Sequence, residues 1–198
     1  MIRQRKVLVA GVVGPSGKLL AAGEVDERAL VEVFAEQAAA LADGGVDLLH
    51  VETMTDLAEA RAAVEGVRQA SDLPLILTMS FDSGRPEDPR TMMGVTPAQL
   101  VAAAGEMGLF GLGTNCGRGL DGYQAVVRAL AQAQTDGVLV AKLNAGIPRV
   151  EGGQVVYDGT PERMADYALW CAENGVGIIG GCCGSTPHHI EAMARALA

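Results

Sequence analysis

The fold is decided by the stretch Asp43-Gly44-Gly45-Val46-Asp47-Leu48-Leu49-His50-Val51-Glu52-Thr53. Its Asp-Gly-Gly start is typical of a helix end, and the apolar run Val46–Glu52 predicts a strand. Ala-rich helical patterns flank this strand at residues 26–42 and 56–70. A largely apolar strand between two helices indicates a parallel sheet covered by helices.

The same alternation repeats along the whole chain. Strands are expected at Val7–Val13, Val46–Glu52, Leu75–Phe81, Leu109–Asn115, Val138–Asn144 and Gly177–Gly181. Helices are expected at residues 26–42, 56–70, 97–106, 121–134, 161–173 and 187–197. Three of them start with a threonine cap followed by proline, at Thr96-Pro97, Thr160-Pro161 and Thr186-Pro187.

The chain length limits the architecture. Six βα units fit either a doubly wound sheet or part of a (β/α)₈ barrel. A complete barrel usually needs about 250 residues, and this chain has 198, so it is about two units short. No linker or low-complexity tract divides the sequence, which predicts a single domain over residues 1–198.

Composition excludes several classes of protein. Hydrophobic residues make up 49% of the chain and charged residues 20%, so it can bury a core. The formal net charge of −9 argues against nucleic acid and anionic membranes as partners. No apolar run reaches the roughly 18 residues that a membrane-spanning helix needs, and no signal peptide is evident. We therefore expect a cytoplasmic protein.

Chemically useful side chains follow the ends of alternate strands. Glu52 ends the second expected strand, Cys116 follows the fourth, and Cys182-Cys183 follows the sixth. Even-numbered strands of a barrel contribute to the same interior layer, so these side chains can converge. Three thiolates with a fourth position open form a sensible catalytic zinc site, because thiolates are soft ligands.

Other interpretations of these residues remain open. Cysteine also serves as a small core residue, which is the interpretation that we favour for Cys171 in the middle of a helix. His188 and His189 could reach a metal, although polar residues in a first helical turn are usually solvated. The glycine-rich stretch Gly180–Gly184 before a helix could instead hold a phosphate.

The stretch from Gly180 to Ile190, which reads Gly-Gly-Cys-Cys-Gly-Ser-Thr-Pro-His-His-Ile, resembles the closing motif of the homocysteine S-methyltransferase family. Asn115-Cys116 is similar to the upstream cysteine motif of that family. Supporting similarities lie at Val9–Pro15, Val51–Thr53, Asn144–Pro148 and Tyr157–Pro161, and those at Met79–Asp82 and Arg90–Thr96 favour bacterial betaine–homocysteine methyltransferases over the cobalamin-dependent methionine synthase branch.

The resemblance implies a (β/α)₈ TIM-type barrel, N-terminally truncated to about six βα units, because Val7–Val13 matches the family's third strand. It implies Zn²⁺ as cofactor, with Cys116, Cys182 and Cys183 as ligands, and Glu52 as the residue that binds the amino group of homocysteine. The partners are then homocysteine and a small methyl donor. Unpaired sheet edges also suggest a second copy or a complementing chain as partner.

The implied reaction is methyl transfer from a betaine-like onium donor to homocysteine, giving methionine. No side chain is assigned as catalytic, because the reacting group is the zinc-activated thiol of the substrate. A quaternary ammonium such as betaine is typically held by aromatic faces. Phe81 and Tyr157 are the aromatic residues expected near the rim, but the sequence cannot show an aromatic cage. The choice of betaine as donor therefore rests on the resemblance alone. The alternatives are a non-catalytic zinc-binding or assembly fragment and a homocysteine-binding module of a cobalamin-dependent methionine synthase.

Overall fold

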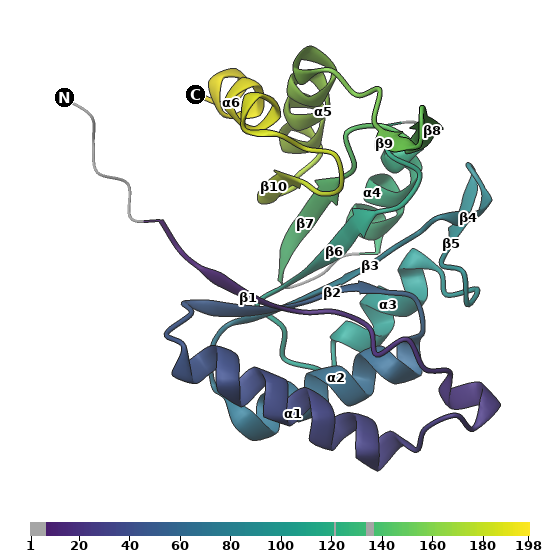
Figure 1. Cartoon of the computed structure of the whole chain (residues 1–198), viewed down its shortest axis with the longest axis vertical. Helices are drawn as coiled ribbons and strands as arrows, with labels where there is room; N and C mark the ends of the chain where they lie inside the picture. The colour runs from purple at the N-terminus through teal and green to yellow at the C-terminus, as the bar shows by residue number, and fades with distance from the viewer. Residues whose placement is uncertain (1–6, 121, 134–136) are drawn as a thin grey trace.

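A computed structural model describes residues 7–120, 122–133 and 137–198. Its main feature is a six-stranded parallel sheet that curls into a half-barrel (Figure 1). The strands, in their order across the sheet, are β1 (Ala10–Val13), β2 (Leu48–Met54), β3 (Leu75–Met79), β6 (Gly111–Cys116), β7 (Val138–Leu143) and β10 (Ile178–Gly181). Every neighbouring pair in this sheet is parallel.

In the described part of the chain, one α-helix follows each of these strands, and the helices lie outside the curl (Figure 1). They are α1 (Glu27–Asp43), α2 (Leu57–Ala70), α3 (Pro97–Ala104), α4 (Tyr123–Gln132), α5 (Pro161–Glu173) and α6 (Pro187–Ala196). The threonine caps predicted from the sequence are confirmed at α3, α5 and α6, and Gln99 completes a capping box with Thr96. Residues 121 and 134 of the fourth expected helix lie outside the described residues.

The strand order decides between the two architectures that the sequence left open. The main strands follow one another across the sheet in chain order, without a reversal. In a doubly wound sheet the strand order reverses at a switch point, and helices cover both faces. When the strand order never reverses, right-handed crossovers place all helices on the same face of the sheet. The fold is therefore that of a TIM-type barrel, of which this chain forms six βα units.

Two features differ from the sequence-based expectation. The first strand begins at Ala10 rather than Val7, because the parallel register with β2 starts at Ala10, opposite Leu48. Two antiparallel hairpins were also missed, one of β4 (Ser83–Arg85) with β5 (Asp88–Arg90) and one of β8 (Arg149–Glu151) with β9 (Gln154–Val156). Both hairpins extend loops at the carboxyl end of the sheet, where barrel enzymes build their sites.

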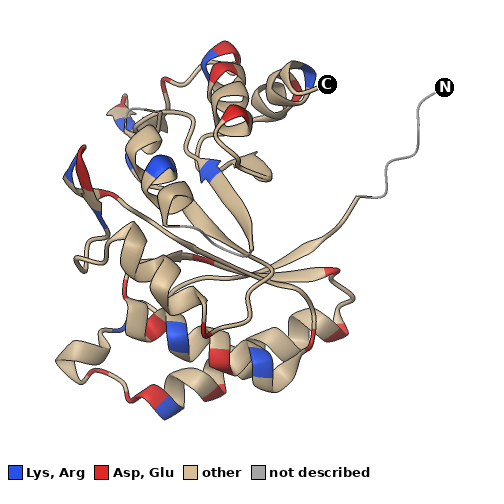
Figure 2. Cartoon of the chain, turned by 180° about the vertical axis from the view of Figure 1, so that it is seen from behind, with Lys and Arg blue, Asp and Glu red and all other residues tan. Residues whose placement is uncertain are grey.

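The core lies between the sheet and the helices. Leu49, Val51, Leu75, Leu77 and Met79 are fully buried on β2 and β3. Most acidic and basic residues lie on the helices and hairpins, and the sheet is almost free of charge (Figure 2). Among the described helices, none has the length and apolar character needed to cross a bilayer.

Candidate metal centre

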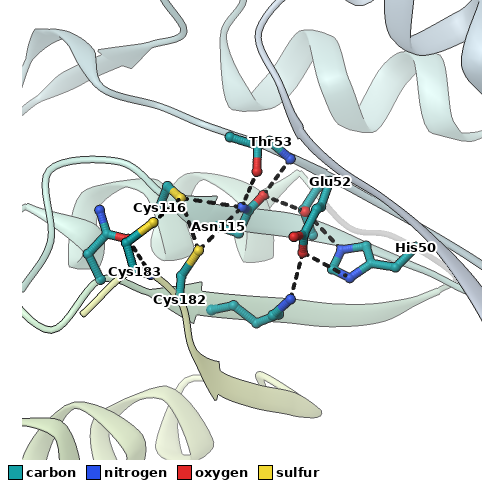
Figure 3. Close-up of polar contacts among 10 residues, drawn as sticks. His50, Glu52, Thr53, Asn115, Cys116, Cys182 and Cys183 are labelled. Atoms are coloured by element: carbon teal, nitrogen blue, oxygen red, sulfur yellow. Dashed lines mark hydrogen bonds and ion pairs between the residues drawn. The ribbon is translucent and has the colours of Figure 1, made fainter. Parts of the chain in front are cut away.

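Three cysteine sulfurs meet at the carboxyl end of the sheet (Figure 3). Cys116 is the last residue of β6, and Cys182 and Cys183 directly follow β10. The Cys116 Sγ lies 3.0 Å from the Cys182 Sγ and 3.9 Å from the Cys183 Sγ. All three sulfurs are within 4.8 Å of one another. The convergence expected from the strand ends is therefore present.

Backbone geometry directs these sulfurs inward. Cys116 has φ of 56°, a left-handed conformation that non-glycine residues seldom adopt and that often marks a functional site. The Cys182 N–H donates to the Leu143 carbonyl at 2.6 Å. The Cys183 N–H donates to the Asn144 side-chain oxygen at 3.0 Å. The cysteine pair is thus fixed against the end of β7.

Asn115 connects the sulfurs to β2 and β3. Its side-chain oxygen accepts hydrogen bonds from the Thr53 N–H at 2.8 Å and from the Thr78 hydroxyl at 2.6 Å, which fixes the orientation of the amide. The Asn115 NH₂ group donates to the Thr53 hydroxyl at 2.6 Å. The same NH₂ group lies 3.6 Å from the Cys116 Sγ and 3.8 Å from the Cys182 Sγ. Asn115 is fully buried and therefore acts as a rigid link.

These hydrogen bonds redistribute acidity within the cluster. Hydrogen bonds from the Cys116 thiol and the Asn115 amide lower the pKa of Cys182 to about 5. The same bond to Cys182, together with burial, raises the pKa of Cys116. The lowered pKa favours the thiolate form of Cys182, and a thiolate favours a cation beside it.

Glu52 lies on β2 and faces the interior of the half-barrel, where its carboxylate is close to Lys142 and His50. The Lys142 ammonium on β7 lies 2.6 Å from a Glu52 carboxylate oxygen. The Nδ1 atom of His50 is 3.4 Å from the same oxygen. Burial and the nearby Lys142 ammonium lower the pKa of His50 to about 4, so the imidazole is neutral. Sequence reasoning missed Lys142, although a lysine within an apolar strand was a signal.

The other side chains that the sequence singled out pack in the core or make contacts that join loops. Cys171 is fully buried in α5 within the core. His189 accepts from the Thr186 N–H and also contacts the Gly159 carbonyl at 2.8 Å, so it joins two loops. Phe81 is 3% exposed. The Tyr157 ring packs on Gly184, and partial desolvation and the Cys183 sulfur raise the pKa of its phenol.

The Gly180–Gly184 loop is a weak phosphate site. The Cys182 N–H already donates to Leu143 at the end of β7, and the Cys183 N–H donates to Asn144. The Ser185 N–H donates to the Cys182 carbonyl. The Thr186 N–H donates to His189. A phosphate cradle depends on free backbone N–H groups, and these four are committed to protein acceptors.

The donor set suits zinc. A tetrahedral zinc with thiolates at about 2.3 Å holds neighbouring sulfurs roughly 3.8 Å apart. The separations of the Cys116 sulfur from the sulfurs of Cys182 and Cys183, 3.0 and 3.9 Å, lie on either side of that value. Three protein sulfurs leave a fourth tetrahedral position for a substrate atom.

The sequence profile described as homocysteine S-methyltransferase matches residues 2–197, almost the whole chain. The chain belongs to this family. The homocysteine methyltransferase MmuM from Escherichia coli superposes on 96% of the chain with a TM-score of 0.75, at 26% identity for its apo form and 28% for its metallated form. The chain covers 62% of the first of these structures and 61% of the second.

Curated relatives in the homocysteine S-methyltransferase family include two methionine synthases. The one from Mycobacterium leprae is 31% identical and the one from Mycobacterium tuberculosis is 33% identical, each over 98% of this chain. The chain spans only 16% of the length of each relative. An isomerase from Streptomyces coelicolor, 16% identical with a TM-score of 0.55, shares the fold alone.

Proposed function

We propose that the chain transfers a methyl group from an onium donor to the thiol of homocysteine, giving methionine. The observation that carries the proposal is the convergence of the Cys116, Cys182 and Cys183 sulfurs within 4.8 Å. Membership of the homocysteine S-methyltransferase family supports the choice of substrate.

The three cysteines would hold Zn²⁺, which lowers the pKa of a bound thiol and keeps it as thiolate at neutral pH. Three thiolate ligands would offset the charge of the ion and would leave a bound substrate sulfur electron-rich. The Asn115 NH₂ group contacts the Cys116 and Cys182 sulfurs and would orient them toward the ion. Glu52 would accept hydrogen bonds from the ammonium group of homocysteine.

The transfer forms one S–CH₃ bond and breaks the bond between that methyl carbon and the donor heteroatom. The electron pair of the broken bond leaves with the donor, which departs as a neutral amine or sulfide. No proton is needed at the leaving group, so no general acid is assigned. The chain contributes alignment, which supplies on the order of 7–11 kcal/mol in well-positioned reactions.

A second candidate is a homocysteine-binding module that works with a cobalamin-bound methyl group. It is favoured by the two methionine synthases, which align with nearly the whole chain over 16% of their own length. The aromatic residues also favour it. Phe81 is buried and Tyr157 packs on Gly184, so these two rings do not form the open cage that a quaternary ammonium prefers.

The test is methionine formation by the zinc-loaded full chain. Homocysteine is supplied with betaine, with a dimethylsulfonium donor or with methylcobalamin, and methionine is measured by mass spectrometry. Methionine from either onium donor supports the first proposal, and methionine from methylcobalamin alone supports the second. A folded, zinc-loaded chain that forms no methionine from any donor contradicts both. The Cys171→Ala variant is the matched control for Cys182→Ala, which should be inactive.

A further inference from the structure

Lys142 is an unusual residue for its position in the sheet. It lies on β7, whose sequence Val138-Leu139-Val140-Ala141-Lys142-Leu143 is otherwise apolar. Its side chain is 25% exposed, and its ammonium contacts the carboxylate of Glu52, which is 19% exposed. The stem of Lys142 passes over Gly180 on β10, where an added Cβ would lie 3.3 Å from the Lys142 Cγ. The glycine therefore leaves space for the lysine.

A partly buried ion pair needs an explanation beyond stability. Removing two charges from water costs several kcal/mol per ion, and their attraction often does no more than offset this. An apolar residue at position 142 would fit the strand pattern. A carboxylate that only receives a substrate ammonium needs no resident cation. The lysine therefore suggests that the pocket receives a negative group as well.

The pair matches a ligand that carries both charges. Glu52 and Lys142 together have no net charge, and their charged atoms are 2.6 Å apart. A zwitterion that inserts between them gives each residue a new opposite charge and leaves the pocket neutral. A ligand with only one charge would separate Glu52 from Lys142 and leave one of these two residues without an opposite charge.

We propose that Lys142 binds the carboxylate of an α-amino acid substrate while Glu52 binds its ammonium group. This inference rests on the proposed function, and it makes Lys142 a residue that determines specificity for the amino-acid end of the substrate. Register supports the placement, since Lys142 is directly opposite Asn115 on β6. The Asn115 amide contacts the Cys182 sulfur, so the ion pair lies one strand position from the cluster.

Binding of sulfur-containing ligands to the chain under reducing conditions tests the proposal without any turnover. Isothermal calorimetry compares methionine, 3-(methylthio)propylamine, which lacks the carboxylate, and 4-(methylthio)butanoate, which lacks the amine. Lys142→Gln should weaken methionine binding by about tenfold or more, because a charge-assisted hydrogen bond is lost. Binding of the amine should be unchanged or tighter. Lys142→Arg should retain most of the methionine affinity.

The matched control is Lys18→Gln, which removes the same charge from an exposed position. It should leave all three affinities unchanged. Methionine binding that is equal or tighter in Lys142→Gln overturns the proposal, because Lys142 would then only compete for Glu52. A chain that binds methionine through Lys142 but transfers no methyl group would contradict the proposed function and leave this inference standing.

Discussion

The Cys116 Sγ lies 3.0 Å from the Cys182 Sγ, although 66 residues separate the two cysteines in the chain. The contact crosses β7, which lies between β6 and β10 in the sheet. The curl of the sheet brings these strand ends together, and the left-handed turn at Cys116 directs its sulfur toward β10. The cluster is therefore a product of the barrel geometry and not of local sequence.

Asn115→Ala should destabilise the chain by about 2–4 kcal/mol. The substitution leaves the Thr53 N–H and the Thr78 hydroxyl without their buried acceptor. Urea unfolding followed by circular dichroism measures the change. Asn174→Ala is the matched control, because the Asn174 side chain donates to the Trp170 carbonyl of its own helix end and joins no strands. Equal effects of the two substitutions would show that Asn115 does not hold the strands together.

Gly66→Ala should be destabilising by about 1–3 kcal/mol, because α1 and α2 approach closely at this point. An added Cβ would lie 2.5 Å from the Val31 carbonyl oxygen and 2.9 Å from the Ala35 nitrogen. Gly105→Ala at the end of α3 is the control, since its added Cβ would lie 3.7 Å from the Ala102 carbonyl oxygen, an ordinary van der Waals contact. Thermal unfolding compares the two variants. A Gly66→Ala chain as stable as the wild type would contradict the described helix contact.

His50 should make the stability of the chain depend on pH. Its pKa is about 4 in the folded chain and 6.5 when unperturbed, so the unfolded chain binds the proton more readily. Protonation of His50 in the unfolded chain therefore lowers the free energy of unfolding as pH falls from 6.5 toward 4. Between pH 7 and pH 5 the loss is about 2 kcal/mol. His50→Asn should flatten this part of the profile in urea unfolding. Identical slopes in variant and wild type would contradict the assignment.

The sequence was sufficient to predict which side chains gather where the parallel strands end. Glu52, Cys116, Cys182 and Cys183 could be placed at one edge because parallel strands end there together. It was not sufficient for contacts across the barrel interior, such as the one from Lys142 to Glu52, because these depend on the curl of the sheet. The β8–β9 hairpin was missed despite its Gly152-Gly153 turn, a pattern that indicates a hairpin.

Asn115 shows the same limit in the site itself. Its position before Cys116 was visible in the sequence, but its bonds to Thr53 and Thr78 join strands that lie far apart along the chain. Only the register between these strands shows which groups the amide satisfies. Propensity and spacing carry no information about such a network.

The most direct measurement is zinc content combined with X-ray absorption on the purified full chain. We predict one zinc per chain with sulfur ligands at about 2.3 Å, and loss of this zinc in Cys116→Ala, Cys182→Ala and Cys183→Ala. Cys171→Ala should retain it, because that sulfur is buried in α5 within the core. A folded wild-type chain that binds no zinc, or a Cys182→Ala chain that binds it as tightly as the wild type, would contradict the account.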